Sequence, residues 1–156
     1  MKEKTKEKFP LKIIKDKLTG RYKAATSIGK LNDETKNIQK ELSFIETDYT
    51  ILLSAIRGLL SEAAMRSKKK ADPRLYWLIG ENIIRFIERL DDLGFYLLKQ
   101  NKTFAADIDI SESSIGRIIS FRKRFSKISK LCPKISWSKY RDNKVPISSK
   151  INTYYP

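Results

Sequence analysis

The sequence contains no histidine and only one cysteine, Cys132. Without an imidazole the chain has no His-ligated metal site, and a serine or cysteine nucleophile lacks its usual activating base. A single cysteine forms no disulfide within the chain, and we interpret Cys132 as a semi-buried thiol rather than a reactive one. A phosphate-binding glycine loop is also missing. We therefore predict that the protein is not an enzyme and holds no cofactor and no metal.

Long hydrophobic stretches are missing as well. No apolar run reaches the ~18 residues that a membrane-spanning helix needs. The opening MKEKTKEKFP has no apolar core of a secretory signal, so we expect a cytoplasmic protein with no membrane partner. Only five prolines and six glycines occur among 156 residues, which argues against a fold rich in strands and turns. An all-α fold is the prediction.

Charge, in contrast, is abundant and uneven, with a formal net charge of +15. Residues 1–30 carry ten basic and three acidic side chains and residues 111–141 carry nine and one, whereas residues 31–110 are nearly balanced. Because each lysine or arginine near a phosphate releases condensed counterions, this distribution indicates a polyanionic partner. Duplex DNA is the preferred candidate, and RNA stays open because backbone contacts do not distinguish the two. The alternative is that the basic runs only keep the protein soluble.

The sequence pattern predicts four parts along the chain. They are a flexible basic arm (1–30), a long helix (31–70), a helical domain containing a helix-turn-helix (71–143) and a C-terminal tail (144–156). Within the arm, FPLKIIKDKL has the pattern of a short amphipathic turn or strand.

Apolar residues in the long helix recur at alternating spacings of four and three, which is a heptad repeat. The repeat consists of Ile38, Leu42, Ile45, Tyr49, Leu52, Ile56, Leu59 and Ala63. Two interpretations fit this pattern equally well. The helix either packs on its own domain or forms a coiled-coil homodimer through residues 38–63.

The segment ADPRLYWLIGENIIRFIERL predicts the next helix, with Asp72 as N-cap and Pro73 in its first position. Trp77 and Tyr76 are expected to anchor the core. Gly80 costs roughly 1 kcal/mol inside a helix unless another backbone approaches closely there. After DDLG, the segment FYLLKQ is expected to continue in helix.

The segment TFAADIDISESSIGRIISFRKRF has the apolar spacing of a helix-turn-helix. Ala105 is the small residue where the two helices cross, and Asp109 falls at the turn. Ile115 and Ile118 follow ten and thirteen positions after Ala105, as the inward side of the second helix requires. The turn usually holds glycine, but aspartate tolerates the left-handed region better than most residues.

The second helix of this motif is expected to read DNA. Its outward side chains are short and polar around Arg117, which reaches a guanine edge in a major groove, and Gly116 leaves room at the closest approach. Basic residues downstream suit phosphate contacts. The predicted DNA-binding residues are Ser111, Ser113, Ser114, Arg117, Ser120, Arg122, Lys123, Arg124 and Lys127.

Four segments, YTILLSAIRGLLSEAA, LYWLIGENI, GFYLLKQ and ISWSKYRD, follow in the order found in the N-terminal domain of YhcG-like proteins. The chain resembles that domain from Tyr49 to Arg141, most specifically at Tyr76–Gly80 and Ser136–Tyr140. The resemblance implies a helical domain that is usually fused to a PD-(D/E)XK nuclease domain. Lys139 stands where the family usually has histidine. Only NKVPISSKINTYYP follows this region, so we expect no nuclease domain and no cutting by this chain alone.

The aromatic pair in SWSKY, Trp137 and Tyr140, has two interpretations. Aromatic residues among cations can stack on nucleic-acid bases. We favour the other interpretation, in which the pair pins the C-terminal segment onto the helical core.

Two functions result from this sequence. The first is a non-catalytic DNA-binding protein, acting as a regulator or as a targeting module for a nuclease or mobile-element partner. The alternative is an assembly or adaptor protein that docks a partner chain through the heptad-patterned helix.

Overall fold

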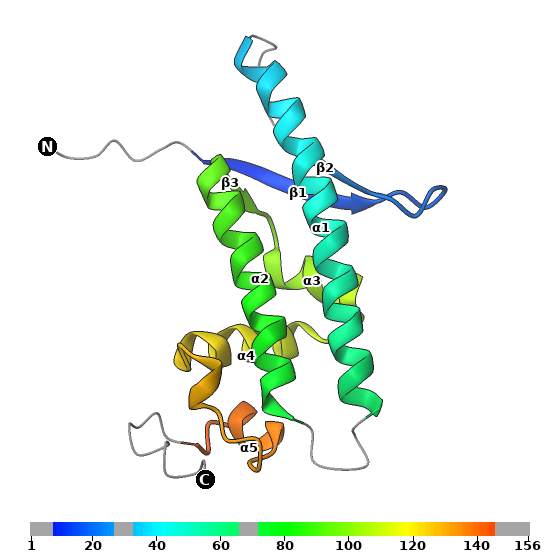
Figure 1. Cartoon of the computed structure of the whole chain (residues 1–156). Coiled ribbons are helices and arrows are strands. Elements are labelled where there is room, and N and C mark those ends of the chain that lie inside the picture. The colour runs from blue at the N-terminus through cyan, green and yellow to red at the C-terminus, as the bar shows by residue number, and fades with distance from the viewer. Residues whose placement is uncertain (1–7, 27–32, 66–71, 146–156) are drawn as a thin grey trace, which may run out of the picture.

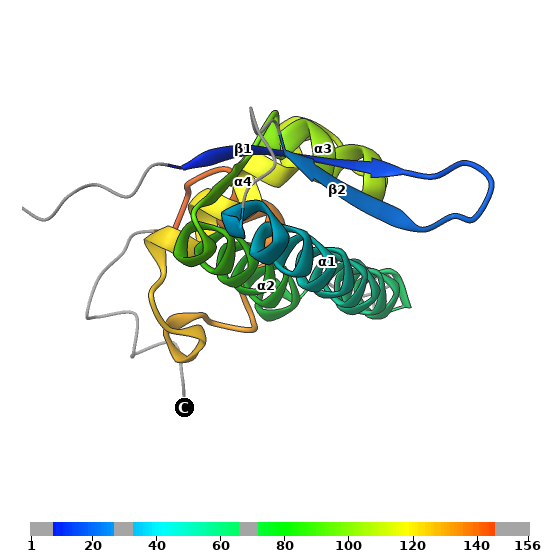
Figure 2. The same cartoon turned by 90° about the horizontal axis from the view of Figure 1, so that it is seen from above.

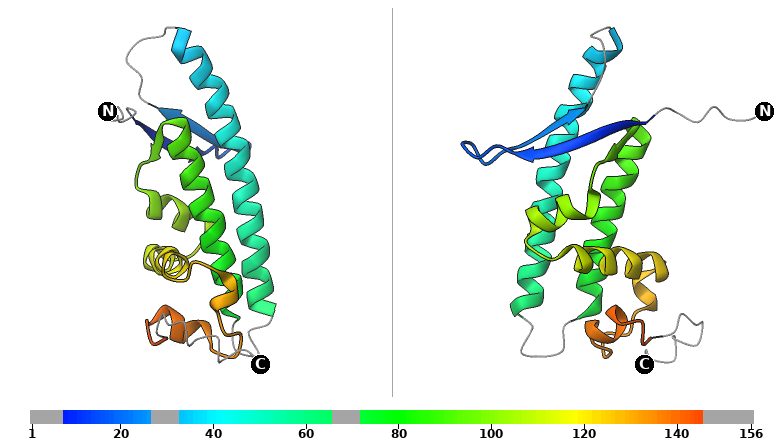
Figure 3. Two further views of the ribbon diagram at one scale, coloured as in Figure 1. Left: turned by 60° about the vertical axis from the view of Figure 1, so that its left-hand side comes forward. Right: turned by 180° about the vertical axis from the view of Figure 1, so that it is seen from behind.

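The computed structural model describes residues 8–26, 33–65 and 72–145 (Figure 1). Two long helices, α1 (Asp33–Met65) and α2 (Pro73–Leu93), run antiparallel side by side. A three-stranded sheet lies near one end of this helix pair. The shorter helices α3 and α4 pack on one side of the same pair (Figures 2 and 3). The remaining elements are β1 (Phe9–Lys15), β2 (Tyr22–Thr26), β3 (Phe95–Leu97), α3 (Gln100–Ile108), α4 (Glu112–Arg124), a 3₁₀ turn (Ile128–Lys130) and α5 (Trp137–Arg141).

The sheet corrects the prediction of an all-α fold, which holds only as a predominantly helical one. Its strand order is β2-β1-β3, with β1 antiparallel to β2 and parallel to β3. Residues 8–26 were predicted to lie in a flexible arm, which is wrong for them, whereas the strand interpretation of FPLKIIKDKL within that arm is confirmed by β1. Burial alternates along β1, because Leu11 and Ile13 are buried whereas Lys12 and Ile14 are exposed. A strand with one buried face requires this period of two. Of the four predicted parts, residues 1–7 and 27–30 of the arm, 31–32 and 66–70 of the long helix, 71 of the helical domain and 146–156 of the tail lie outside the described residues.

The segment FYLLKQ also differs from its prediction as helix. Gly94 ends α2 in the left-handed conformation, with φ 87°, and the chain then turns into β3 beside β1. Phe95 and Leu97 are buried and Tyr96 between them is exposed, so the short apolar run fits a strand as well as a helix. This segment forms a strand because it pairs with β1, some 85 residues earlier in the chain. The local sequence of FYLLKQ carries no information about that pairing.

The heptad stripe of α1 is used within the chain. It faces α2, β2 and α3, and its buried members are Leu42, Ile45, Tyr49, Leu52, Ile56 and Ala63. Tyr49 is at the centre, with its ring against Tyr22, Phe86 and Phe104. These side chains are thus covered as the first of our two interpretations requires. A homodimer through residues 38–63 stays a prediction, and it would need a face of α1 other than this stripe.

The start and middle of α2 explain how the next elements are placed. The Asp72 side chain accepts the Arg74 backbone N–H at 3.0 Å, and Pro73 takes the first turn, so the predicted N-terminus is confirmed. A Cβ added at Gly80 would lie 2.7 Å from Cβ of Arg122 and 3.0 Å from the Ile118 carbonyl oxygen. The second helix of the sequence motif, α4, therefore crosses α2 at Gly80, where a side chain would hold it away. None of the described helices combines the length and the apolar content that crossing a membrane requires.

Candidate nucleic-acid interface

The helices α3 and α4 meet at a tight turn. Asp109 has φ 67°, in the left-handed region that its position requires, and its N–H donates to the Ala105 carbonyl at 2.9 Å. Ser111 then caps α4, with its side chain accepting the Ser114 N–H at 3.1 Å. The inward residues Phe104, Ala105, Ile115 and Ile118 are all buried. The spacing that sequence reasoning singled out therefore sets the angle between α3 and α4, and leaves the opposite side of α4 facing outward.

Arg122 lies on the inner face of α4, against α2. Its guanidinium carbon is 4.7 Å from the centroid of the Trp77 ring, and its Nη2 donates to the Glu81 carboxylate at 3.3 Å. Only 20% of its side chain is exposed. We predicted that Arg122 faces outward and contacts phosphate. In the structure its side chain instead contacts Trp77 and Glu81 of α2. The signal was present in the sequence, because Arg122 follows Ile115 by seven positions, which returns to the same side of a helix.

The remaining predicted residues divide into two groups. Ser111 and Ser114 belong to the helix cap, where the Ser111 hydroxyl donates to the Ser114 hydroxyl at 2.8 Å, so they position α4. Ser113, Arg117, Ser120, Lys123 and Lys127 are exposed, and Arg124 is half-buried. The outer face of α4 therefore consists of small polar side chains around Arg117, followed by exposed lysines.

A pocket of about 300 Å³ lies between this outer face and the C-terminal segment. From α4 it is lined by Ser113, Gly116, Arg117, Ser120 and Arg124, and from α5 and the residues after it by Tyr140, Arg141 and Asn143. We define these residues as the α4–α5 pocket. Sequence reasoning missed its C-terminal half, since Arg141 was read as part of a general basic run and nothing local places it beside Arg117.

The C-terminal segment is held in place by its two aromatic residues. The Trp137 ring stacks on Tyr76 with centroids 4.4 Å apart and planes 6° from parallel, and Tyr140 is fully buried. The Tyr140 hydroxyl accepts the Cys132 backbone N–H at 2.8 Å, and the Tyr140 carbonyl accepts Nη2 of Arg124 at 3.0 Å. These contacts support the pinning interpretation of SWSKY over base stacking, because both rings are already buried.

Positive charge dominates the α4–α5 pocket. Arg141 is hydrogen-bonded to the neighbouring Asp142 at 3.1 Å, and this raises the pKa of the Arg141 guanidinium. The same hydrogen bond lowers the pKa of the Asp142 carboxyl, and Lys144 and Arg117 add smaller attractions. Burial lowers the pKa of the Arg124 guanidinium. Three arginines thus line the pocket, with Asp142 as an adjacent carboxylate.

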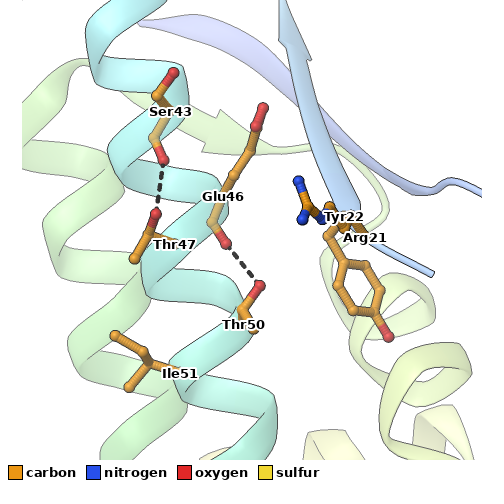
Figure 4. A pocket seen from close by; sticks show the side chains of 7 residues that line it. All are labelled: Arg21, Tyr22, Ser43, Glu46, Thr47, Thr50 and Ile51. Atoms are coloured by element: carbon orange, nitrogen blue, oxygen red, sulfur yellow. Dashed lines mark hydrogen bonds between the residues drawn. The ribbon is translucent and has the colours of Figure 1, made fainter. Parts of the chain in front are cut away.

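A second pocket, of about 470 Å³, lies between β2 and α1 (Figure 4). Its hydroxyl groups serve the helix itself, because Thr47 and Thr50 donate to the carbonyls of Ser43 and Glu46 one turn earlier. It also differs from the α4–α5 pocket in charge, since its two charged residues, Arg21 and Glu46, have opposite signs. We therefore take the α4–α5 pocket as the candidate site.

Within residues 8–26, 33–65 and 72–145, no group of three or more histidine, cysteine, aspartate or glutamate residues is arranged to hold a metal ion. Comparison of the chain with protein-family models, with curated proteins and with solved structures found no match. The resemblance to YhcG-like proteins accordingly stays a prediction.

Proposed function

We propose that the protein is a non-catalytic DNA-binding protein that places α4 in the major groove of duplex DNA. The observation that carries the proposal is the composition of the outer face of α4. Ser113, Gly116 and Ser120 are small enough to let a helix approach a groove closely, and Arg117 adds positive charge beside them.

The turn between α3 and α4 supports this use of α4. A helix that enters a groove must be held rigidly from behind, and α4 is held by buried isoleucines and by its close crossing of α2 at Gly80. Exposed Lys123 and Lys127 at the end of α4 suit contacts to the flanking phosphates. In this assignment the two-helix unit is a helix-turn-helix, and Arg122 contributes to its support rather than to DNA contact.

Two roles follow from DNA binding without cutting. The protein acts as a regulator, or it brings a separate nuclease or mobile-element partner to DNA, which the resemblance to YhcG-like proteins favours. We place this activity in the cytoplasm and expect no cofactor and no membrane partner.

Fluorescence anisotropy with labelled duplexes, measured across a salt series, tests this proposal. We expect affinity to fall steeply from low to physiological salt, because phosphate neutralisation releases counterions. A selection from random duplexes should enrich a preferred site. Absence of duplex binding even at low salt would refute the proposal.

One observation favours the alternative function of an assembly protein. Phe44 and Ile51, seven residues apart on α1, are 70% and 61% exposed, so α1 carries two exposed apolar side chains outside the heptad stripe. Sedimentation of the chain and of Phe44→Ser/Ile51→Ser tests it. A concentration-dependent mass that the double variant abolishes supports docking through α1, whereas a strict monomer in both proteins contradicts self-assembly there.

A further inference from the structure

We propose that the α4–α5 pocket is a phosphate-binding site in which Arg117, Arg124 and Arg141 hold the anion. The assignment of the phosphate to a nucleic acid rests on the proposed function, whereas the assignment of an anion site rests on the residues that line the pocket. The proposal also reassigns Arg117 from reading a base to binding a phosphate.

The α4–α5 pocket carries an excess of positive charge. Arg117, Arg124 and Arg141 line a single pocket, and no acidic side chain is among its lining residues. Asp142 is adjacent and neutralises one of the three guanidinium groups through its hydrogen bonds to Arg141. Two positive charges therefore stay without a matching carboxylate in the pocket, and a phosphate group carries one to two negative charges at neutral pH.

Arg124 is held in one orientation and has an unused donor. Its Nη2 donates to the Tyr140 carbonyl, and its guanidinium lies 5.4 Å from the Phe125 ring, so the group is fixed in orientation. Its buried Nε has no hydrogen-bond partner among the described residues. A shielded, unused donor on a partly buried guanidinium is costly, and a neighbouring anion offsets that cost. Burial acts in the same direction, since it lowers the pKa of Arg124.

The other residues of α4 that line the pocket are small. Ser113 and Ser120 lie one turn on either side of Gly116 and Arg117 on the same face of α4, so their hydroxyls and the arginines border one space. Gly116 adds no side chain to fill it. The volume of about 300 Å³ stands at the lower end of the range for small-ligand pockets, which leaves room for a phosphate and part of its sugar.

The α4–α5 pocket is built from two separate segments of the chain. Tyr140 and Trp137 pin α5 so that Arg141 faces α4, and Arg124 bonds back to the Tyr140 carbonyl. A lone basic helix face attracts phosphate without fixing its position. Guanidinium groups presented from two pinned segments fix one phosphate, and thereby fix the register of α4 on a nucleic acid.

The first experiment measures duplex affinity across a salt series for Arg117→Gln and Arg141→Gln, with Arg89→Gln as the charge-matched control. Arg89 lies in the last turns of α2, is paired with Asp48 at 3.0 Å and is not among the residues that line the pocket. Each pocket variant is expected to lower affinity equally for all sequences and to reduce the slope of log K against log salt by about 1. Circular dichroism melts verify that each variant is folded.

The second experiment needs no DNA. Inorganic phosphate is added to the full chain, with chloride at matched ionic strength as reference, and the melting temperature is followed. We expect phosphate to raise the melting temperature of the wild type and of Arg89→Gln, and to leave Arg117→Gln and Arg141→Gln unchanged.

The two experiments separate the failure of each proposal. Phosphate stabilisation without duplex binding would retain the pocket and refute the DNA-binding function. Duplex binding in which both pocket variants match Arg89→Gln, together with no phosphate stabilisation, would refute the pocket and retain the function. If the pocket variants weaken binding, a hairpin-capped duplex and open duplexes with and without 5′-phosphate identify the source. Preference for the 5′-phosphate assigns a terminal phosphate, and equal binding assigns a backbone phosphate.

Discussion

The two faces of α4 carry arginines with opposite roles. On the inner face, Arg122 lies over the Trp77 ring and bonds to Glu81, so its charge is compensated within the chain. On the outer face, Arg117 is exposed and lines the α4–α5 pocket with two more arginines. Arg117 and Arg122 are five residues apart, which is more than one helical turn and less than two, so their side chains leave α4 on different sides. Arg122 therefore supports the fold, whereas Arg117 is a candidate ligand-binding residue.

This difference shows that a basic run on a helix is not one functional unit. The same sequence, GRIISFRKR, supplies core contacts, a pocket wall and exposed lysines, according to the angle at which each side chain leaves the helix. Substitutions on the inner face should change stability and leave binding unchanged, and substitutions on the outer face should do the reverse. The following predictions test that separation.

The largest effect is expected at Ile115, which is fully buried on the inner face. Ile115→Ala removes packed atoms and leaves a cavity, at a cost of about 2–5 kcal/mol in the free energy of unfolding. Urea denaturation followed by circular dichroism measures it. Ser113→Ala, on the outer face two residues earlier, is the control and should lie within about 0.5 kcal/mol of wild type. Similar stabilities of the two variants would contradict the separation of faces.

The next effect concerns the crossing of α2 and α4. Gly80→Ala places a methyl group 2.7 Å from Cβ of Arg122 and 3.0 Å from the Ile118 carbonyl, so α4 must move. We expect a loss of about 1–3 kcal/mol, which exceeds the gain in helix propensity. Gly58→Ala is the matched control, because nothing lies within 4 Å of its added Cβ, and it should gain about 0.5–1 kcal/mol. A stabilised Gly80→Ala would show that α4 does not approach α2 this closely.

A smaller effect is expected at Arg122. Arg122→Gln loses the contact with Trp77 and the ion pair with Glu81, which is partly compensated because Arg85 also lies 3.7 Å from Glu81. We expect the free energy of unfolding to fall by about 1 kcal/mol, measured by urea denaturation. Duplex affinity should be unchanged once it is corrected for the folded fraction. Arg117→Gln should show the reverse, with unchanged melting and weaker duplex binding. If both variants lost the same duplex affinity, both faces of α4 would belong to the DNA interface, which would contradict the separation of faces.

The smallest effect on stability is expected at Gly116, on the outer face. The nearest atom to an added Cβ is Nδ2 of Asn101 at 3.7 Å, an ordinary contact, so Gly116→Ala should gain about 0.5–1 kcal/mol. If α4 enters a groove, the added methyl group stands at the closest approach and duplex affinity falls. Thermal melts and anisotropy on the same sample measure both quantities. Unchanged affinity would place the DNA on another surface.

Local patterns in the sequence predicted the helical elements because their signals are short in range. Asp72 with Pro73, and Ala105 with Asp109 and Ile115, act within a few turns of helix. Asp72 caps α2, Asp109 has a positive φ, and Ala105 and Ile115 are buried. The need for a close neighbour at Gly80 was also readable, although the identity of that neighbour was not.

The features that were missed depend on contacts between distant parts of the chain. β3 forms because Phe95–Leu97 pairs with Phe9–Leu11, and no local signal in FYLLKQ specifies a strand over a helix. Likewise the α4–α5 pocket requires Arg141 beside Arg117, which follows from the burial of Trp137 and Tyr140 against several elements. The heptad stripe was correctly identified as apolar, but its period is the same whether the partner is this chain or another.

The parallel pairing of β1 with β3 has a consequence for how the protein is made. During synthesis β1 emerges first, yet its central position in the sheet is complete only once Phe95–Leu97 has left the ribosome and α1 and α2 have folded back on each other. Until then the β1–β2 hairpin has an open edge. Pairing over so long a stretch of chain closes slowly compared with helix formation. We therefore expect the β1–β3 pairing to form later than the β1–β2 hairpin, and the open edge of β1 is an aggregation hazard in the nascent chain until then.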